Sequence, residues 1–141
     1  MELRALALNS QDKLKHLEFI QAVINRMAFN SFLLKGWSVT LVAALFALAA
    51  KDANKNYVLV AYIPVVIFWV IDAYFLSQER LFRSLYDDVR KKKEDEIDFS
   101  MNTEDFRRGR NSWASSFLSK TLLLFYFSMV GIMLVVMYFI K

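Results

Sequence analysis

The chain has 141 residues, of which 57% are hydrophobic and 16% aromatic, with three glycines, one proline, no cysteine and a formal net charge of +4. This composition excludes a disordered chain, a collagen-like repeat and a disulfide-stapled secreted fold, and the length allows one domain. The hydrophobic fraction exceeds the roughly 45–50% that is usual for soluble domains, so the class of protein depends on where the hydrophobic residues lie.

Residues 1–31 are predicted to form a cytoplasmic amphipathic helix. Ser10 or Gln11 could start its periodic part, and apolar residues recur after this point at spacings of three and four. These residues are Leu14, Leu17, Ile20, Val23, Ile24 and Met27. We expect this face to pack on the protein's own cytoplasmic helices, with the membrane surface or a partner helix as alternatives. No Gly or Pro precedes the next apolar run, so one long helix bent at Asn30 and Ser31 is an open alternative.

Three apolar runs occupy residues 32–50, 57–77 and 121–140. A hydrocarbon core about 30 Å thick is crossed by about 20 helical residues, because a helix rises about 1.5 Å per residue. Each run matches this length. A soluble bundle is the alternative, but the chain has too few polar residues to cover three helices that are apolar on every side. The sequence therefore predicts an all-α integral membrane protein with three transmembrane helices and an external loop over residues 51–56.

The positions of Lys and Arg predict the orientation of these spans. Residues 1–30 carry four and residues 79–120 carry ten, whereas the 51–56 loop carries two and the C-terminus one. Positively charged residues gather on the cytoplasmic side of membrane proteins. We therefore expect a membrane protein with a cytoplasmic N-terminus and an external C-terminus. Charges interrupt the first 30 residues, so no signal peptide is expected and the first span is predicted to stay as an anchor.

Residues 78–120 are predicted to form a cytoplasmic helical segment between the second and third spans. The apolar pattern of the second span continues past Ser77, which predicts a helix that ends near Glu96. The charge run RKKKEDE, over residues 90–96, is expected to form ion pairs along this solvated helical end. A further helix is predicted to start at Asn102 or Thr103, because acidic residues follow.

Arg107, Arg108 and Arg110 form a cationic cluster before the third span. Such a cluster could bind a phosphate group of a lipid, a nucleotide or RNA. It also fits the rule that cations mark the cytoplasmic end of a span, with Trp113 as an interfacial anchor. We favour this second interpretation, because the topology requires these cations in either case.

Two ionisable residues, Lys35 and Asp72, interrupt the predicted spans. A charge at the centre of a membrane helix costs about 2.5–3.5 kcal/mol on the insertion scale. Lys35 lies about 6 Å beyond Ser31 and Asp72 about 7.5 Å before Ser77 along their helices, so both are expected near the cytoplasmic face. We predict that they form an intramembrane charge pair, with snorkelling of Lys35 to the headgroups as the alternative. A minimal ion-coupled transporter that uses Asp72 is a further hypothesis.

A stripe of small residues on the first span predicts close association with another helix. The stripe, with spacings of four and three, consists of Gly36, Thr40, Ala44 and Ala47. It suits self-association and intramolecular packing equally well. The third span carries Thr121 and Ser128 as its polar side chains, so we expect that helix to face lipid.

The sequence contains few of the residues and motifs that form catalytic sites. His16 is the single histidine, cysteine is absent, and the three glycines do not form a phosphate-binding loop. We therefore predict no enzyme activity, no cofactor and no metal, and we expect His16 to lie on a solvated surface. No nucleic-acid partner is expected, because the two cytoplasmic regions each carry a net charge near +1.

The segment HLEFIQAVINRMAFNSFLLKGWSVTLVAALFALAA, over residues 16–50, resembles short bacterial membrane proteins of unassigned function. In plan, the chain also resembles the small two- or three-span membrane effectors encoded in bacterial antiviral operons. This resemblance implies an oligomer that perturbs the inner membrane when a sensor partner activates it, and it carries over no functional residue.

We therefore hypothesise a non-enzymatic, oligomeric inner-membrane protein with pore-forming or membrane-disrupting activity, controlled by a cytoplasmic protein partner. Polar positions near the inner face motivate the pore, namely Lys35, Ser38, Thr40 and Asp72. A passive membrane anchor or accessory subunit of a larger complex is the alternative.

Overall fold

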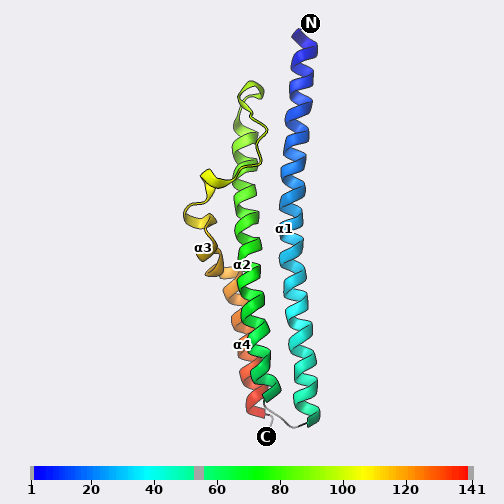
Figure 1. The fold of residues 1–141 in the computed structure, drawn as a ribbon, viewed down its shortest axis with the longest axis vertical. Helices are drawn as coiled ribbons and strands as arrows, with labels where there is room; N and C mark the ends of the chain where they lie inside the picture. Colours follow the sequence, from blue (N-terminus) through cyan, green and yellow to red (C-terminus); the bar gives the residue numbers. More distant parts are fainter. Residues whose placement is uncertain (1, 53–55, 140–141) are drawn as a thin grey trace.

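A computed structural model describes the backbone of residues 2–52 and 56–139 and the side chains of residues 10–51 and 56–139. Within these ranges the chain forms three long helices, α1 (Glu2–Asp52), α2 (Asn56–Lys91) and α4 (Lys120–Phe139). They lie side by side along one axis, with α1 and α2 antiparallel and α4 against α2 (Figure 1). This part of the chain therefore forms an elongated helical bundle.

Short helical turns connect α2 to α4. They are η1 (Glu94–Glu96), η2 (Glu104–Phe106), η3 (Gly109–Asn111) and α3 (Trp113–Phe117). Past the end of α2, the connection first returns on the side of α2 that faces α1. It then crosses to the other side of α2, where α3 packs on α2 before α4 begins (Figure 1).

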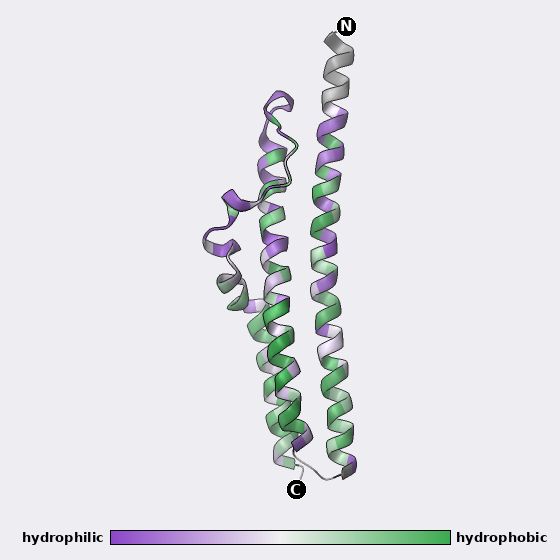
Figure 2. Ribbon diagram, viewed as in Figure 1, coloured by the Kyte–Doolittle hydropathy of each residue, from purple (hydrophilic) through white to green (hydrophobic). Residues whose placement is uncertain are grey.

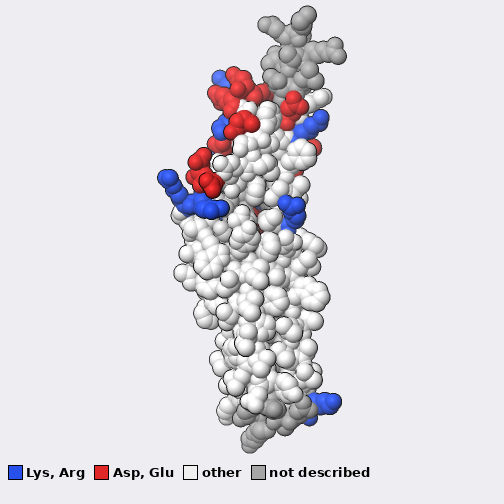
Figure 3. All heavy atoms as spheres, viewed as in Figure 1, with Lys and Arg blue, Asp and Glu red and all other residues white. Residues whose placement is uncertain are grey.

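Charged and apolar residues separate along the long axis. Figure 2 shows the hydrophobic colour over α4 and the adjoining halves of α1 and α2, and Figure 3 shows most charged side chains at the opposite end. We call this charged region, formed by residues 10–30 and 79–112, the polar end. In the described part of the chain, α1, α2 and α4 are each long and apolar enough to cross a membrane. The all-helical fold and its three span-length helices are confirmed.

Two buried clusters hold the helices together. The first lies in the apolar part and includes Val42, Ala61, Val65, Tyr126 and Met133 from α1, α2 and α4. The second lies at the polar end and consists of Ile20, Ile24, Leu85, Val89 and Ile97. The amphipathic face of the N-terminal region thus packs on the protein's own helix, as we expected from its periodicity.

The N-terminal region and the first span form one helix. The candidate start at Ser10 or Gln11 is wrong, because α1 begins at Glu2 and continues through Asn30 and Ser31 to Asp52. No Gly or Pro interrupts α1 before Gly36, so nothing in the backbone requires a break where the polar face ends.

The helix of the second span is shorter than predicted, ending at Lys91 instead of near Glu96. The expected pairing within the RKKKEDE run is also wrong, since two of its cations pair with the acids that precede them. Arg90 pairs with Asp87 at 3.1 Å and Lys92 with Asp88 at 2.7 Å. The reason is that helical i+3 and i+4 spacing is lost after α2 ends.

The helix predicted to start at Asn102 or Thr103 is reduced to the single turn η2. Left-handed backbone conformations flank it, at Phe99 with φ 54° and at Gly109 with φ 55°. Such conformations do not fit a right-handed helix. The segment between α2 and α4 is therefore mostly irregular.

The third span, which we expect to face lipid, also has a face that packs within the bundle. One side of α4 is buried, and this side consists of Leu122, Tyr126, Met129 and Met133. These residues recur at spacings of three and four, so they lie on one face and pack against the first buried cluster.

Candidate functional site: a polar cluster between the apolar helices

Asp72 on α2 is the centre of a polar cluster within the apolar part of the molecule. Its side chain is fully buried, and its Oδ2 lies 2.6 Å from the Nζ of Lys35 on α1. Its Oδ1 accepts a hydrogen bond of 2.5 Å from the Ser31 hydroxyl. The Tyr126 hydroxyl on α4 donates to Oδ2 over 3.2 Å. One carboxylate therefore joins the three long helices of the described chain.

The α1 side of this cluster depends on helical spacing. Ser31 and Lys35 are four residues apart, so their side chains lie on one face. The Lys35 ammonium donates to the Ser31 hydroxyl over 2.8 Å, while that hydroxyl donates to Asp72. Lys35 therefore contacts Asp72 directly and also orients the second group that binds it.

The structure thus brings the predicted pair, Lys35 and Asp72, together. The Lys35 side chain is 21% exposed, because its ammonium turns toward Asp72 instead of extending to the surface. A buried ion pair needs further hydrogen bonds to offset the cost of desolvation. Ser31 and Tyr126 supply these bonds.

Sequence reasoning missed Ser31 and Tyr126 as members of the cluster. In the sequence, Ser31 stands at the boundary of the first span, and Tyr126 stands among the apolar residues of the third span. The available signal was the spacing of Ser31 and Lys35 and the position of Tyr126 on the recurring Leu122–Met133 face. The pairing of α4 with Asp72 depends on a contact across 54 positions, which the pattern of either helix does not specify.

Aromatic stacking holds Tyr126 in place. The Trp69 ring stacks on Tyr126 at 5.6 Å and on Phe117 at 4.5 Å between centroids. The Trp69 indole also donates to the Phe117 carbonyl over 3.1 Å. Trp69 therefore fixes the junction of α3 and α4 against α2, and the Tyr126 hydroxyl is aimed at Asp72 as a result.

The Asp72 carboxylate is not accessible to a ligand from solvent. Both oxygens of Asp72 are occupied, and its carboxylate has no exposed surface. Among the described residues, no group of three or more His, Cys, Asp or Glu side chains could hold a metal ion. The arrangement fits a helix-to-helix tether better than a site that binds and releases an ion.

The predicted association stripe points away from the bundle. Gly36, Thr40, Ala44 and Ala47 are all exposed, and no atom of another segment lies within 4 Å of the place where a Cβ on Gly36 would stand. α1 packs on its neighbours through another face, which includes Ser38, Val42 and Ala49. The stripe is therefore not used for packing within the described chain.

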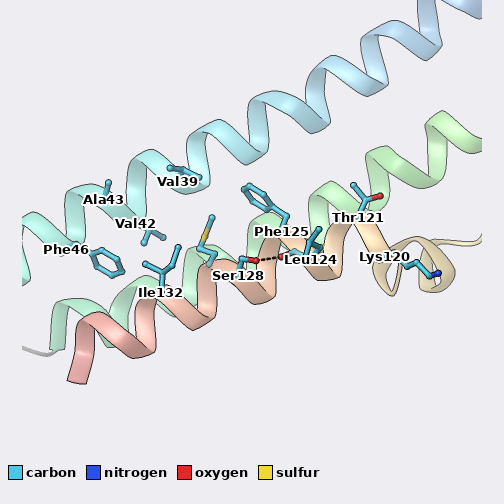
Figure 4. A pocket seen from close by; sticks show the side chains of 11 residues that line it. Val39, Val42, Ala43, Phe46, Lys120, Thr121, Leu124, Phe125, Ser128 and Ile132 are labelled. Atoms are coloured by element: carbon cyan, nitrogen blue, oxygen red, sulfur yellow. Dashed lines mark hydrogen bonds between the residues drawn. The ribbon is translucent and has the colours of Figure 1, made fainter. Parts of the chain in front are cut away.

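A groove separates α1 from α4 in the apolar part. Its volume is about 760 Å³, and its walls include Val39, Val42 and Phe46 from α1 and Lys120, Phe125 and Ile132 from α4. In Figure 4, Val39, Val42 and Phe46 face Phe125 and Ile132 across the gap, and Lys120 lies beyond one end of it. The bundle is therefore open on this side, although both helices pack on α2.

Hydrogen bonds at the polar end fasten the irregular segment to α2. The Ser77 hydroxyl donates to the Asn111 carbonyl over 2.8 Å, and the Asn111 amide donates to Ser84 and to the Phe106 carbonyl. The Arg80 guanidinium donates to the Arg110 carbonyl over 2.9 Å. Burial and the nearby Arg110 guanidinium lower the pKa of Arg80 below its usual value. These bonds position the later part of the segment on α2, while the Lys13 ammonium of α1 donates to the Lys92 carbonyl over 2.6 Å at the start of the segment.

The predicted anion-binding cluster remains on the surface. The side chains of Arg107, Arg108 and Arg110 are all exposed; the first two lie between η2 and η3, and Arg110 lies within η3. Arg110 uses its backbone carbonyl to bind Arg80. The Trp113 indole donates to the Val70 carbonyl over 3.3 Å, which places this aromatic residue beside α2 at the edge of the apolar region.

The expectation of a solvated His16 is wrong. Its side chain is 5% exposed, and its Nε2 has no hydrogen-bond partner among the described residues. Phe99 covers the imidazole edge to face, with ring centroids 5.5 Å apart. The cause is the returning segment, whose left-handed residue Phe99 places its ring on α1.

A second groove, of about 720 Å³, lies beside His16 at the polar end. Its walls include Lys15, Phe19 and Arg26 from α1, and Phe99 and Met101 from the returning segment. Phe19 and Phe99 are both substantially exposed. The groove thus combines aromatic surface with cations, outside the apolar part of the molecule.

Comparisons of this chain with protein families, curated proteins and solved structures give no match.

Proposed function

We propose that this chain is a non-enzymatic, oligomeric membrane protein of the bacterial inner membrane. The observation that carries the proposal is the exposed stripe on α1. Small residues let the backbones of two membrane helices approach closely, and Gly36 has free space in front of it. The stripe lies within a helix of span length, so a second copy is its natural partner.

The proposed activity is pore formation or membrane disruption by this oligomer. Of the polar positions that suggested a pore, Ser38 and Asp72 are buried within one chain. Thr40 is exposed on the stripe, and its hydroxyl donates to the Gly36 carbonyl of the same helix. A pore would therefore form between copies, at the stripe, with the Asp72 cluster keeping each copy rigid.

The orientation proposed from the charges places the polar end in the cytoplasm. Its aromatic and cationic groove near Phe19 and Phe99 supports contact with a cytoplasmic protein partner. This groove also favours the second candidate function, an accessory subunit that anchors a soluble protein to the membrane. The fully bound carboxylate of Asp72 gives less support to ion-coupled transport.

The test combines mass and leakage measurements. We expect the detergent-extracted protein to contain several copies and to release dye from liposomes once its partner is present. Ala44→Phe should reduce the mass to one copy and abolish dye release, whereas Val66→Phe, on an exposed position of α2, should do neither. An oligomer that never releases dye but retains a stoichiometric soluble protein would favour the accessory subunit. A wild-type mass of one copy would contradict the proposed assembly.

A further inference from the structure

The groove between α1 and α4 is apolar along most of its length and has a cationic side chain, Lys120, at one end. Apart from its end at Lys120 and Thr121, its walls are almost entirely apolar side chains (Figure 4). Among the described residues, Lys120 forms no ion pair and its side chain is exposed. A ligand that fits both parts must have an apolar body and a negatively charged end.

The length of the groove matches one leaflet of a bilayer. From Thr121 to Ile132, α4 rises about 16 Å, which is about half of a hydrocarbon core roughly 30 Å thick. The groove therefore ends near the middle of the predicted span. An acyl chain spans one leaflet, so a groove of this length and apolar lining accommodates one.

The charged end of the groove lies at the expected depth for a headgroup. Lys120 is the first residue of α4, and the N-terminus of a helix adds partial positive charge from its free N–H groups. On the facing helix, Lys35 lies one turn before Val39, and its ammonium stands 5.9 Å from the centroid of the Phe125 ring. Asp72 neutralises Lys35, so Lys120 provides the unpaired charge.

We propose that this groove binds one acyl chain of an anionic glycerophospholipid, with the lipid phosphate at the Lys120 ammonium. The lipid would contact both α1 and α4 and fill the open side of the bundle. This inference rests on the membrane insertion included in the proposed function, and it does not depend on pore formation.

Native mass spectrometry of the delipidated full chain in detergent tests the site. Phosphatidylglycerol and phosphatidylcholine with identical acyl chains are added in separate titrations. We expect about fivefold tighter binding of phosphatidylglycerol, from a contribution of about 1 kcal/mol per cation. Lys120→Gln should abolish this preference. Lys51→Gln, which removes an exposed cation from the opposite end of the apolar part, should retain it.

A second pair of variants tests the channel itself. Ser128→Phe places a ring in the groove and should reduce binding of both lipids. Leu134→Phe enlarges an exposed position of α4 outside the groove and should leave binding unchanged. Equal affinity of the wild type for both lipids would overturn the proposal, as would an equal effect of Lys120→Gln and Lys51→Gln. Loss of oligomers with unchanged lipid binding in Ser128→Phe would assign the groove to a second copy, which also overturns it.

Alkaline carbonate extraction of cell membranes distinguishes a failure of the lipid site from a failure of membrane insertion. A chain released by carbonate is not integral, so membrane insertion fails and the lipid site fails with it. A chain that is retained but shows no preference for phosphatidylglycerol rejects the lipid site alone.

Discussion

Lys35 on α1 and Asp72 on α2 form an ion pair of 2.6 Å inside the apolar part of the molecule, where the Asp72 side chain has no exposed surface. The two residues are 37 positions apart, and the pair holds α1 against α2 at the start of the span-length region. A lone charge there would be costly, and each residue of the pair compensates the charge of the other. The pair therefore fixes both the contact between the helices and their relative position along the axis.

A double-mutant cycle should show this dependence. Lys35→Met and Asp72→Asn are each expected to lower the free energy of unfolding by about 3 kcal/mol, because each leaves a buried polar group without its partner. The double variant should lose clearly less than the sum of the two losses. Unfolding in detergent, followed by circular dichroism, provides the measurement. Additive losses would contradict a direct pair.

Tyr126→Phe should weaken the attachment of α4. It removes the hydrogen bond to Asp72, and such bonds between membrane helices contribute about 0.6 kcal/mol on average and up to about 1.7 kcal/mol. Tyr62→Phe is a matched control, because the Tyr62 hydroxyl is buried and has no partner among the described residues. The same unfolding assay should show no loss for Tyr62→Phe. Equal losses in the two variants would argue against a specific role for the Tyr126 hydroxyl.

His16→Leu should stabilise the polar end. The buried Nε2 lacks a partner in the described part of the chain, and an unsatisfied buried polar group costs about 1–3 kcal/mol. The apolar side chain would still pack beneath Phe99. We expect a higher melting temperature in detergent for His16→Leu and little change for His16→Gln. A lower melting temperature for His16→Leu alone would show that the imidazole makes a stabilising polar contact.

Asn111→Ala should release the segment between α2 and α4. It removes the side-chain bond to Ser84, which fastens this segment to α2, and the bond to the Phe106 carbonyl within the segment. We expect faster trypsin cleavage after Arg107 and Arg108, by about tenfold if about 1.4 kcal/mol of local stability is lost. Asp95→Asn, at an exposed position in the same segment, provides the control. Unchanged cleavage would mean that the Ser77 and Arg80 contacts suffice.

The candidate site was only partly predictable from the sequence. Lys35 and Asp72 were recognisable because a charge in an apolar run is rare, and their opposite signs and similar depth suggested a pair. Ser31 and Tyr126 were not recognised, because a Ser at a span boundary and a Tyr among apolar residues are ordinary. Their roles become visible only when α1 and α4 are placed beside Asp72.

The sequence alone determined the helical class, the three span-length helices and the separation of charge from apolar surface, because each follows from local composition and from the rise of a helix. Tertiary structure decided which face of each helix is buried. It turned the Gly36 stripe outward, buried His16 beneath Phe99 and left a groove between α1 and α4. The physical reason is that the apolar half of α1 and all of α4 are apolar on nearly every side, so hydrophobicity does not choose among their faces there. Long-range contacts make the choice: Lys35 and Tyr126 bind Asp72 on α2 in the apolar part, and Phe99 covers His16 at the polar end.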